Sequence, residues 1–318
     1  MPPPTISDIQ SAAHAIRANI AKVIVGKDAV IDLALVALLC EGHILFEDVP
    51  GIGKTTLAKA LARSLACSFR RIQFTPDLMP SDVTGLAVYN QKTQEFEFRA
   101  GPIMTQVLLA DEINRATPRT QSALLEAMQE RQLTVDGATK ILPRPFLVLA
   151  TQNPIELEGT FPLPEAQLDR FFMKLELGYP TEAEESAILS RFERDEPLES
   201  LQPVMDTETI LAMQRVIRTV RVEASVREYI VALVRATRAH PAVELGASPR
   251  GSLYLYHAAQ AHAAIQGRAF VLPDDVKFLA PFVLTHRLII SAQTRLRGRD
   301  VKEILRQVIE SVPVPVEQ

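Results

Sequence analysis

Short, uninterrupted apolar runs recur in the first half of the chain, at residues 44–46, 107–110 and 146–150. Such runs are typical of parallel strands that are buried on both faces. Helical patterns separate the runs, so we predict an α/β domain in which a parallel sheet lies between layers of helices. Each run is followed by polar residues. Because ligands of open parallel sheets bind beyond the carboxyl ends of the strands, we expect the chemistry there.

The second half of the chain has a different pattern. Beyond the first 180 residues glycine is scarce, and apolar residues recur at helical spacing, as at Ile210, Met213, Val216, Ile217 and Val220. We therefore predict an αβα domain over residues 1–180 and an all-helical domain over residues 181–318. Residues 225–228 have the spacing of a capping box, and Ser248 before Pro249 marks another helix start.

Two segments of the first half have the pattern of β-hairpins. Residues 88–98 form a strand-like stretch, a polar turn and an alternating stretch, and residues 132–141 contain an Asp136-Gly137 turn. Decoration of the sheet edge and a functional role both remain open for these hairpins.

Composition and charge narrow the class of protein. The 318 residues, 47% hydrophobic and 23% charged, indicate a folded chain of about two domains rather than a disordered one. The net charge of −4, from 34 basic and 38 acidic residues, argues against a dedicated nucleic-acid or anionic-membrane binder. We predict no membrane span and no signal peptide, and expect a cytoplasmic protein. Cys40 and Cys67 lack a metal or redox spacing and are expected to be buried thiols.

The first apolar run leads into a glycine-rich loop and then a helical pattern. The loop matches the phosphate-binding pattern Gly-x-x-x-x-Gly-Lys-[Ser/Thr] at its tail, whereas Asp48 stands in place of the first glycine. Glycines let backbone N–H groups turn toward phosphate, the lysine supplies a charge for the β- and γ-phosphates, and the threonine hydroxyl can bind Mg²⁺. A dinucleotide fingerprint would need a third glycine where Thr56 stands, and is excluded. We assign nucleotide binding to Pro50, Gly51, Ile52, Gly53, Lys54, Thr55 and Thr56.

The other two runs end in residues suited to hydrolysis. After the second run, Asp111 would hold Mg²⁺ together with Thr55, and Glu112 would polarise the attacking water. After the third run, the neutral amide of Asn153 can contact the γ-phosphate and orient the water. The chain lacks the guanine-reading motif Asn-Lys-x-Asp, so ATP is favoured over GTP.

Two arginines complete the candidate chemistry. Arg170 follows Leu168-Asp169, and Arg250 stands at the predicted helix start after Ser248. Either guanidinium can stabilise charge on a transferred phosphoryl group, although taken alone each is more often a surface or structural residue.

These motifs, in this order and ahead of a helical second half, resemble the AAA+ ATPases, and most closely the MoxR family. The segments that carry the resemblance are residues 47–55, 109–116, 150–154 and 163–171. The Lys-Thr and Asp-Glu motifs occur in many AAA+ proteins, whereas the second and fourth segments are more specific. The resemblance covers nearly the whole chain, and Asp48 looks like a variant familiar within the family.

The resemblance assigns roles to the residues at the strand ends. Lys54 and Thr55 would form the Walker A pair, and Asp111 and Glu112 the Walker B pair. Asn153 would be the sensor 1 residue. ATP and Mg²⁺ are the implied cofactors.

Other roles implied by the resemblance concern the adenine base and the neighbouring subunit. Arg170 would be the arginine finger that reaches a neighbour's nucleotide, with Arg115 and Arg119 as alternatives. Arg250 would be the sensor 2 residue of a helical lid. The dipeptide Val25-Gly26 would line the adenine pocket.

The resemblance further implies a ring-shaped homo-oligomer, usually a hexamer, that hydrolyses ATP at its subunit interfaces. Such proteins act as chaperone-like factors that mature or activate other complexes, often with a separate von Willebrand factor A domain protein. Both hairpins would then face the pore or a partner. Two alternatives stay open. One is an ATPase subunit of a metal chelatase or a nucleic-acid motor, of which the charge disfavours the motor; the other is a nucleotide-gated scaffold with little turnover, against which Glu112 argues.

Overall fold

The structure, a computed structural model, describes residues 3–154, 159–193 and 196–315. Its centre is a parallel five-stranded sheet with the strand order β2-β5-β8-β1-β9. The strands are β1 (Ile44–Glu47), β2 (Phe69–Gln73), β5 (Val107–Asp111), β8 (Leu147–Gln152) and β9 (Met173–Leu175). The three apolar runs form the adjacent strands β5, β8 and β1, so the predicted parallel sheet is confirmed.

The two outer strands, β2 and β9, do not have the pattern of an uninterrupted apolar run. In β2 only Ile72 is buried, because Arg70 and Arg71 occupy the middle of the strand. In β9 the half-buried Lys174 separates two buried residues. Edge strands have a single neighbour and tolerate charged side chains, which is why the sequence pattern missed them.

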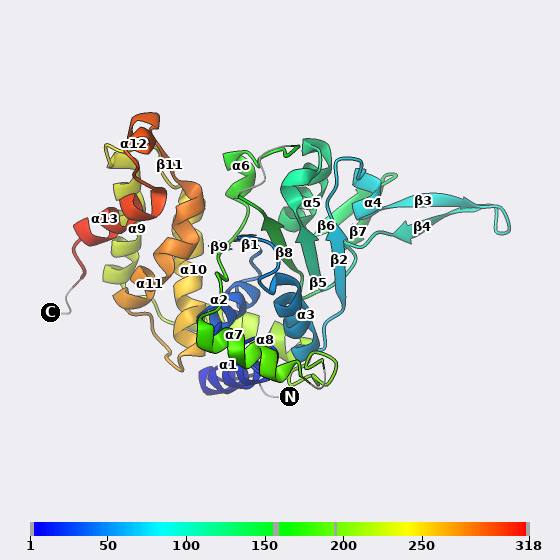
Figure 1. The fold of residues 1–318 in the computed structure, drawn as a ribbon, viewed down its shortest axis with the longest axis horizontal. Coiled ribbons are helices and arrows are strands. Elements are labelled where there is room, and N and C mark those ends of the chain that lie inside the picture. The colour runs from blue at the N-terminus through cyan, green and yellow to red at the C-terminus, as the bar shows by residue number, and fades with distance from the viewer. Residues whose placement is uncertain (1–2, 155–158, 194–195, 316–318) are drawn as a thin grey trace.

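Alternation along the strands sends successive side chains to opposite faces of the sheet. On β5, Val107 and Leu109 belong to the core that the sheet shares with the first three helices, whereas Leu108 and Ala110 pack with α5 (Pro118–Glu130). The sheet is therefore covered on both faces, as predicted (Figure 1). The helices of this part are α1 (Ile6–Ile20), α2 (Asp28–Leu39), α3 (Lys54–Ser64), α4 (Pro80–Thr84), η1 (Ile113–Arg115), α5 (Pro118–Glu130) and α6 (Glu165–Leu168).

The second half is predominantly helical, but its described residues also contain short β structure that the all-helical prediction missed. β10 (Val243–Leu245) and β11 (Ile289–Ile290) form a short antiparallel pair. Strands of two or three residues are too short to interrupt a helical periodicity that is judged over longer windows. The helices are α7 (Glu182–Arg191), α8 (Thr207–Val216), η2 (Ile217–Thr219), α9 (Ala224–Ala239), α10 (Pro249–Ile265), α11 (Pro273–Leu284), η3 (Thr285–Arg287), α12 (Ala292–Leu296) and α13 (Val301–Ser311). We call the part from α9 onward the lid.

The predicted domain boundary falls immediately before α7, which is capped by Thr181. Beyond it, Gln214 of α8 donates a hydrogen bond of 2.8 Å to the carbonyl oxygen of Leu38 in α2. The chain therefore contacts the sheet domain again before it enters the lid, and the division at residues 180 and 181 stays a prediction.

The two predicted helix starts have different outcomes. Ser248 caps α10 by accepting a hydrogen bond from the backbone N–H of Arg250, and Pro249 lies in the first turn, as predicted. The predicted capping box at residues 225–228 is wrong, because α9 begins at Ala224 and its N-cap residue is Glu223, without a side-chain capping bond. A Ser-x-x-Glu spacing can also occur inside the first turn of a helix. The spacing alone therefore placed the predicted N-cap at Ser225 instead of Glu223.

Both predicted hairpins are confirmed. β3 (Gly85–Asn90) pairs with β4 (Glu95–Ala100), and β6 (Gln132–Val135) pairs with β7 (Ala138–Ile141) through a turn in which Asp136 and Gly137 both have positive φ. The β3–β4 hairpin projects far from the rest of the molecule (Figure 1). Its exposed Tyr89 and Phe96 rings stack edge to face, with centroids 5.3 Å apart.

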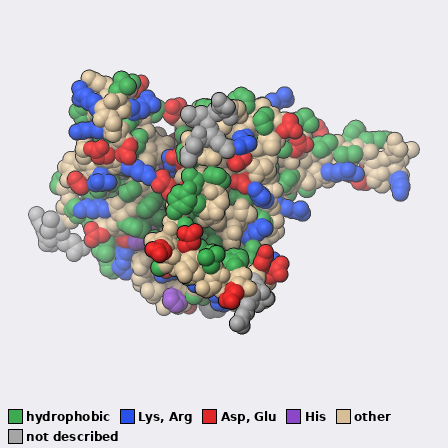
Figure 2. Space-filling model, in the orientation of Figure 1, with side chains coloured by type: hydrophobic (Ala, Val, Ile, Leu, Met, Phe, Trp, Pro, Cys, Tyr) green, Lys and Arg blue, Asp and Glu red, His purple; other side chains and the backbone are tan. Residues whose placement is uncertain are grey.

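The surface of the protein has the mixed charge that the composition predicts. On the face shown in Figure 2, basic and acidic side chains are interspersed. Within the described ranges, no helix combines the length and the apolar character needed to cross a bilayer.

The two cysteines differ in burial. Cys40 is buried as predicted, whereas Cys67 is only partly buried. Burial raises the pKa of both thiols to about 12.

His43 is a buried polar residue that joins three elements at the start of β1. The backbone N–H of Val148 donates to its Nδ1 at 3.0 Å, so the ring proton lies on Nε2, which donates to the Met128 carbonyl oxygen at 3.0 Å. Burial lowers the pKa of His43 from 6.5 to about 4. A second proton on Nδ1 would break the bond from Val148.

We expect the free energy of unfolding to fall as the pH is lowered from 7 to 5. Unfolded His43 takes up a proton below its ordinary pKa of 6.5, whereas the folded ring stays neutral down to about pH 4, so acid favours the unfolded chain. The pKa difference corresponds to about 2 kcal/mol over this interval. Urea denaturation at both pH values measures the loss, and His43→Gln should reduce it by that amount. An equal loss in the variant would show that His43 does not cause it.

Candidate active site

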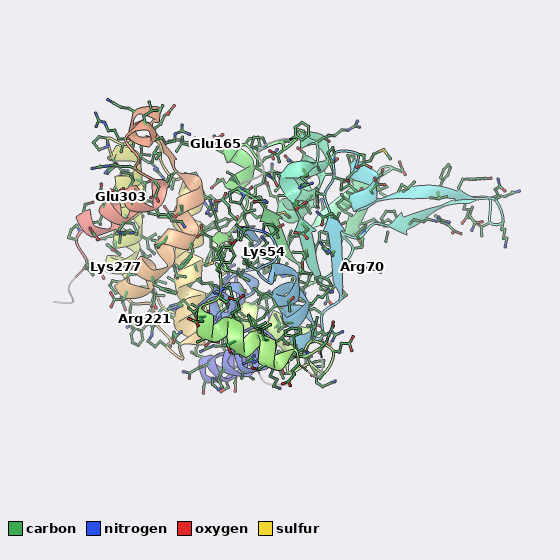
Figure 3. The ribbon with its side chains drawn as sticks, viewed as in Figure 1. Lys54, Arg70, Glu165, Arg221, Lys277 and Glu303 are labelled. Atoms are coloured by element: carbon green, nitrogen blue, oxygen red, sulfur yellow. The ribbon has the colours of Figure 1, made fainter. Side chains whose placement is uncertain are left out.

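A cavity of about 360 Å³ lies at the carboxyl ends of β1, β5 and β8. Lys54, one of its lining residues, begins α3 near the middle of the molecule (Figure 3). The loop after β1, the ends of β5 and β8, and the edge strand β2 all contribute to the cavity. Its described lining residues are Asp48, Pro50, Gly51, Gly53, Lys54, Thr55, Thr56, Arg71, Gln73, Asp111, Glu112, Thr151, Gln152 and Asn153.

The loop between β1 and α3 has the backbone that a phosphate site requires. Gly51 and Gly53 have φ values of 84° and 97°, a region that residues with a Cβ rarely adopt. The helix then begins at Lys54, whose Nζ donates to the carbonyl oxygens of Asp48 and Val49, both at 2.8 Å. Burial lowers the pKa of Lys54, while the charges of nearby acids oppose that shift. A cation and a helix N-terminus thus meet at one point, which suits a phosphate group.

Asp48, the departure from the general loop pattern, has a structural role that glycine could not fill. Its Oδ2 accepts hydrogen bonds from the backbone N–H groups of Leu177 and Gly178, at 2.6 and 2.9 Å. The side chain therefore ties the start of the loop to the segment that follows β9.

The hydroxyl group of Thr151 bonds to both Asp111 and Glu112. Thr151 donates to Asp111 Oδ1 at 2.6 Å and accepts from the backbone N–H of Glu112 at 2.9 Å. Glu112 has φ 56° and ψ 50°, a left-handed conformation that costs energy for a residue with a side chain. Adjacent carboxylates are thereby turned to different places in the cavity, so that one can serve a metal and the other a water molecule.

Two cavity residues from β2 were missed by the sequence reasoning. Arg71 Nη2 lies 2.6 Å from Asp111 Oδ2, and Gln73 Nε2 donates to Glu112 Oε2 at 2.7 Å. Glu112 Oε2 also pairs with Arg115 Nε at 2.9 Å. In the sequence, the two residues of β2 could have been found from the spacing of Phe69, Arg71 and Gln73, which lie two positions apart and so share one face of a strand. In a strand of five residues this pattern is weak.

The side chains of this cavity could hold Mg²⁺ only together with the phosphates of a bound nucleotide. Across the described residues, no group of three or more His, Cys, Asp and Glu side chains is placed to hold a metal ion. Thr55 and Asp111 nevertheless line the same cavity, and Mg²⁺ is commonly bound through one or two carboxylates together with substrate phosphates. Such an ion would neutralise the charge that develops on the phosphates.

Asn153 lines this cavity, whereas three other predicted nucleotide-binding residues do not belong to its described lining. Ile52 packs against the hydrophobic core. Val25 and Gly26 lie between α1 and α2, where a Cβ on Gly26 would come 1.7 Å from a carboxylate oxygen of Glu184. Their role at the adenine base stays a prediction.

The structure places Arg170 and Arg250 in another cavity, of about 240 Å³. It includes Gly42 and His43 and therefore lies at the amino end of β1, with the four residues of that strand, about 13 Å, between it and the phosphate loop. Of the predicted alternatives, Arg115 pairs with Glu112 in its own chain, and Arg119 is exposed at the start of α5. The two predicted arginines thus line one cavity, and Lys54 lines the other.

This second cavity has an excess of positive charge. Arg131 and Arg218 line it as well, and Glu41 is the one carboxylate among its described lining residues. Glu41 is already engaged by Arg131, at 2.9 Å, and by Arg144. We call this the arginine cavity; its charge suits an anion supplied from outside the chain.

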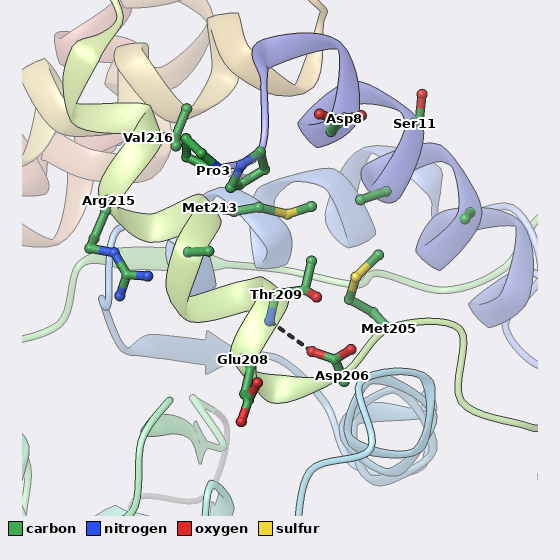
Figure 4. A pocket seen from close by; sticks show the side chains of 14 residues that line it. Pro3, Asp8, Ser11, Met205, Asp206, Glu208, Thr209, Met213, Arg215 and Val216 are labelled. Carbon is green, nitrogen blue, oxygen red and sulfur yellow. Dashed lines mark hydrogen bonds between the residues drawn. The ribbon is translucent and has the colours of Figure 1, made fainter. Parts of the chain in front are cut away.

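A larger groove, of about 970 Å³, lies between α1 and α8 (Figure 4). Its acids mainly serve the helices: Asp8 completes the capping box of α1, and Asp206 Oδ1 accepts from the backbone N–H of Thr209 at 2.7 Å. Asp8 and Asp206 are thus engaged in helix capping, and size alone does not make the groove a catalytic site.

Comparison with known proteins agrees with this arrangement. A family model described as the ATPase family associated with various cellular activities (AAA) matches residues 43–173, and an AAA lid domain model matches residues 235–308. The chain is 54% identical over 300 residues to the Bacillus subtilis protein YeaC (94% of each chain) and 41% identical over 306 residues to chaperone MoxR1 of Mycobacterium tuberculosis (93% of this chain, 81% of the relative).

Two further relatives cover almost the whole chain. Protein MoxR of Methylorubrum extorquens is 32% identical over 335 residues, which are 98% of this chain and 97% of the relative. A crystal structure of a protein from Cytophaga hutchinsonii that is inferred to be an ATPase matches with a TM-score of 0.91 and 38% identity, over 98% of this chain and 97% of that one.

Proposed function

The chain belongs to the MoxR family of AAA+ ATPases and is an ATPase, and we propose that it hydrolyses ATP with Mg²⁺ at the subunit interfaces of a homo-oligomeric ring. The ring, which we take to be a hexamer, would use the reaction to remodel a client protein or complex. Lys54 and Thr55 bind the nucleotide phosphates, Asp111 holds Mg²⁺ with Thr55, and Glu112 and Asn153 polarise and orient the attacking water.

The observation that carries this proposal is the separation of the two cavities along β1. The phosphate loop lies at the carboxyl end of the strand and the arginine cavity at its amino end. Because the length of β1, about 13 Å, lies between the two cavities, neither Arg170 nor Arg250 lines the cavity in which Lys54 of the same chain would hold a phosphate. In a ring, however, the arginine cavity of one subunit can face the phosphate loop of the next. We therefore assign both Arg170 and Arg250 to the nucleotide of the neighbouring subunit.

The proposed work on a client rests on two supports. One relative is named a chaperone, MoxR1 of Mycobacterium tuberculosis. The projecting β3–β4 hairpin exposes Tyr89 and Phe96, which suit contact with apolar segments of another protein. We place this activity in the cytoplasm, and any von Willebrand factor A domain partner would be a separate chain. The glutamate in the cavity supports turnover over a scaffold role, because binding alone requires no base.

Mixing two inactive variants tests the proposed interface. Lys54→Ala subunits lose the phosphate contact but keep Arg170, whereas Arg170→Ala subunits bind ATP but lack the finger. We expect each variant alone to be nearly inactive and the mixture to recover a substantial fraction of the wild-type rate, since mixed interfaces hold one intact copy of each part. Failure of every mixing ratio to restore activity would overturn the assignment of Arg170 to the neighbouring site.

A further inference from the structure

The segment that carries Arg170 is held by the lid. In Figure 1, α6, which leads into this segment, lies between α10 and α5. Arg287 of η3 donates from Nε to Asp169 Oδ1 at 2.9 Å, and from Nη2 to the carbonyl oxygens of Asp169 and Phe171, at 3.1 and 2.5 Å. Both neighbours of Arg170 in the chain are therefore bound by one guanidinium.

The second carboxylate oxygen of Asp169 also faces the lid. Ser248 Oγ donates to Asp169 Oδ2 at 3.1 Å, and Arg250 Nη1 lies 3.7 Å from the same atom. We call Asp169, Ser248 and Arg287 the lid clamp. The clamp joins the segment on either side of Arg170 to the N-terminus of α10 and to η3, two places in the lid that are 39 positions apart in the chain.

The chemistry of the clamp requires an arginine. The side chain of Arg287 is 1% exposed, and its planar fork reaches three acceptors on the segment of Arg170 in directions that a lysine ammonium could not match. Burial lowers its pKa to about 10, and the charge of Asp169 opposes that shift, so the guanidinium is charged at neutral pH. The Tyr254 ring of α10 lies 5.0 Å from the guanidinium carbon. Its Nη1 contacts the Val283 carbonyl oxygen and His286 Nε2 within the lid, so this buried guanidinium joins the segment of Arg170 to the lid.

We propose that the lid clamp is the positioning device for the arginine finger: Arg287 and Asp169 fix where Arg170 stands, and the lid, rather than the sheet domain alone, determines how Arg170 meets the neighbouring nucleotide. The inference rests on the proposed function, in which Arg170 acts on that neighbour. Movement of the lid in one subunit would then be transmitted to hydrolysis in the next, because displacement of a catalytic group by about 1 Å can cost about 100-fold in rate.

The test places a clamp variant in one or the other partner of the mixed ring. Asp169→Asn is nearly isosteric and removes the ion pair with Arg287. In the first mixture, the subunit that donates the finger carries the clamp variant. Lys54→Ala/Asp169→Asn subunits are mixed with Arg170→Ala subunits. In the second mixture, the subunit that binds the nucleotide carries the clamp variant. Arg170→Ala/Asp169→Asn subunits are mixed with Lys54→Ala subunits. Arg287→Lys is placed in both in the same way, and ring assembly is verified by sedimentation.

A matched control comes from a buried ion pair inside the lid. Asp275 is 3% exposed and accepts from Arg268 Nη1 and Nη2, at 2.8 and 2.6 Å. Asp275→Asn in the finger donor weakens an ion pair of the lid without touching the clamp. Its mixture should hydrolyse ATP at close to the rate of the unmodified mixture.

We expect kcat to fall about 100-fold in the first mixture and less than twofold in the second, with KM for ATP unchanged in both. Equal losses in both mixtures, or an equal loss with Asp275→Asn, would overturn the positioning role and leave the trans site standing. If the unmodified mixture of Lys54→Ala and Arg170→Ala subunits shows no activity, the proposed function fails, and the positioning role fails with it.

Discussion

Glu112→Gln should lower kcat for ATP hydrolysis about 1,000-fold while ATP still binds, because a positioned general base contributes about 100- to 10,000-fold. The neutral amide keeps the size of the side chain and can still contact Gln73 and Arg115, which meet the carboxylate in the cavity. The cavity should therefore keep its shape and lose only the base. Single-turnover hydrolysis and equilibrium binding of a fluorescent ATP analogue separate the two effects.

Glu126→Gln is the matched control for this change, since Glu126 is an exposed acid on α5. Its turnover should equal that of the wild type. Equal turnover in Glu112→Gln as well would remove Glu112 from the reaction and favour a base supplied by another residue.

Arg170→Ala should also lower kcat about 1,000-fold in rings built only of that variant, because an arginine finger contributes about 1,000- to 100,000-fold to phosphoryl transfer. Nucleotide affinity should change little, since Arg170 lies in the arginine cavity, away from the phosphate loop of its own chain. The steady-state rate at saturating ATP, with binding measured separately, shows the effect.

Arg119→Ala distinguishes this assignment from its alternative. Arg119 is exposed at the start of α5 and was an equally basic candidate by sequence. A larger loss in Arg119→Ala than in Arg170→Ala would transfer the finger role to Arg119.

The chemistry of the phosphate cavity was largely predictable because it lies in contiguous residues. The loop from Gly51 to Thr56 begins a few residues after β1, and the Asp111-Glu112 pair stands at the end of β5; parallel strands bring their carboxyl ends together. Local order in the sequence thus fixes proximity in space. Asn153 follows the same rule at the end of β8.

The contacts that come from tertiary packing could not be predicted in this way. Arg71 reaches Asp111 only because β2 pairs with β5, and the mixed pattern of β2 hides that strand. The hydrogen bond from Arg287 to Asp169 spans 118 positions in the chain. Likewise, the separation of Arg170 and Arg250 from Lys54 depends on which end of β1 each cavity occupies, which no local motif records.

If catalysis requires two subunits, the rate per subunit must depend on protein concentration, and this dependence is the decisive measurement. The assay contains Mg²⁺ and saturating ATP, uses Glu112→Gln as the blank, and is paired with sedimentation at each concentration. We predict a rate per subunit that is near the blank where the protein is monomeric, rises steeply as subunits assemble and then levels. A constant rate above the blank, present where sedimentation shows monomers, would mean that one chain contains the complete active site and would contradict the account.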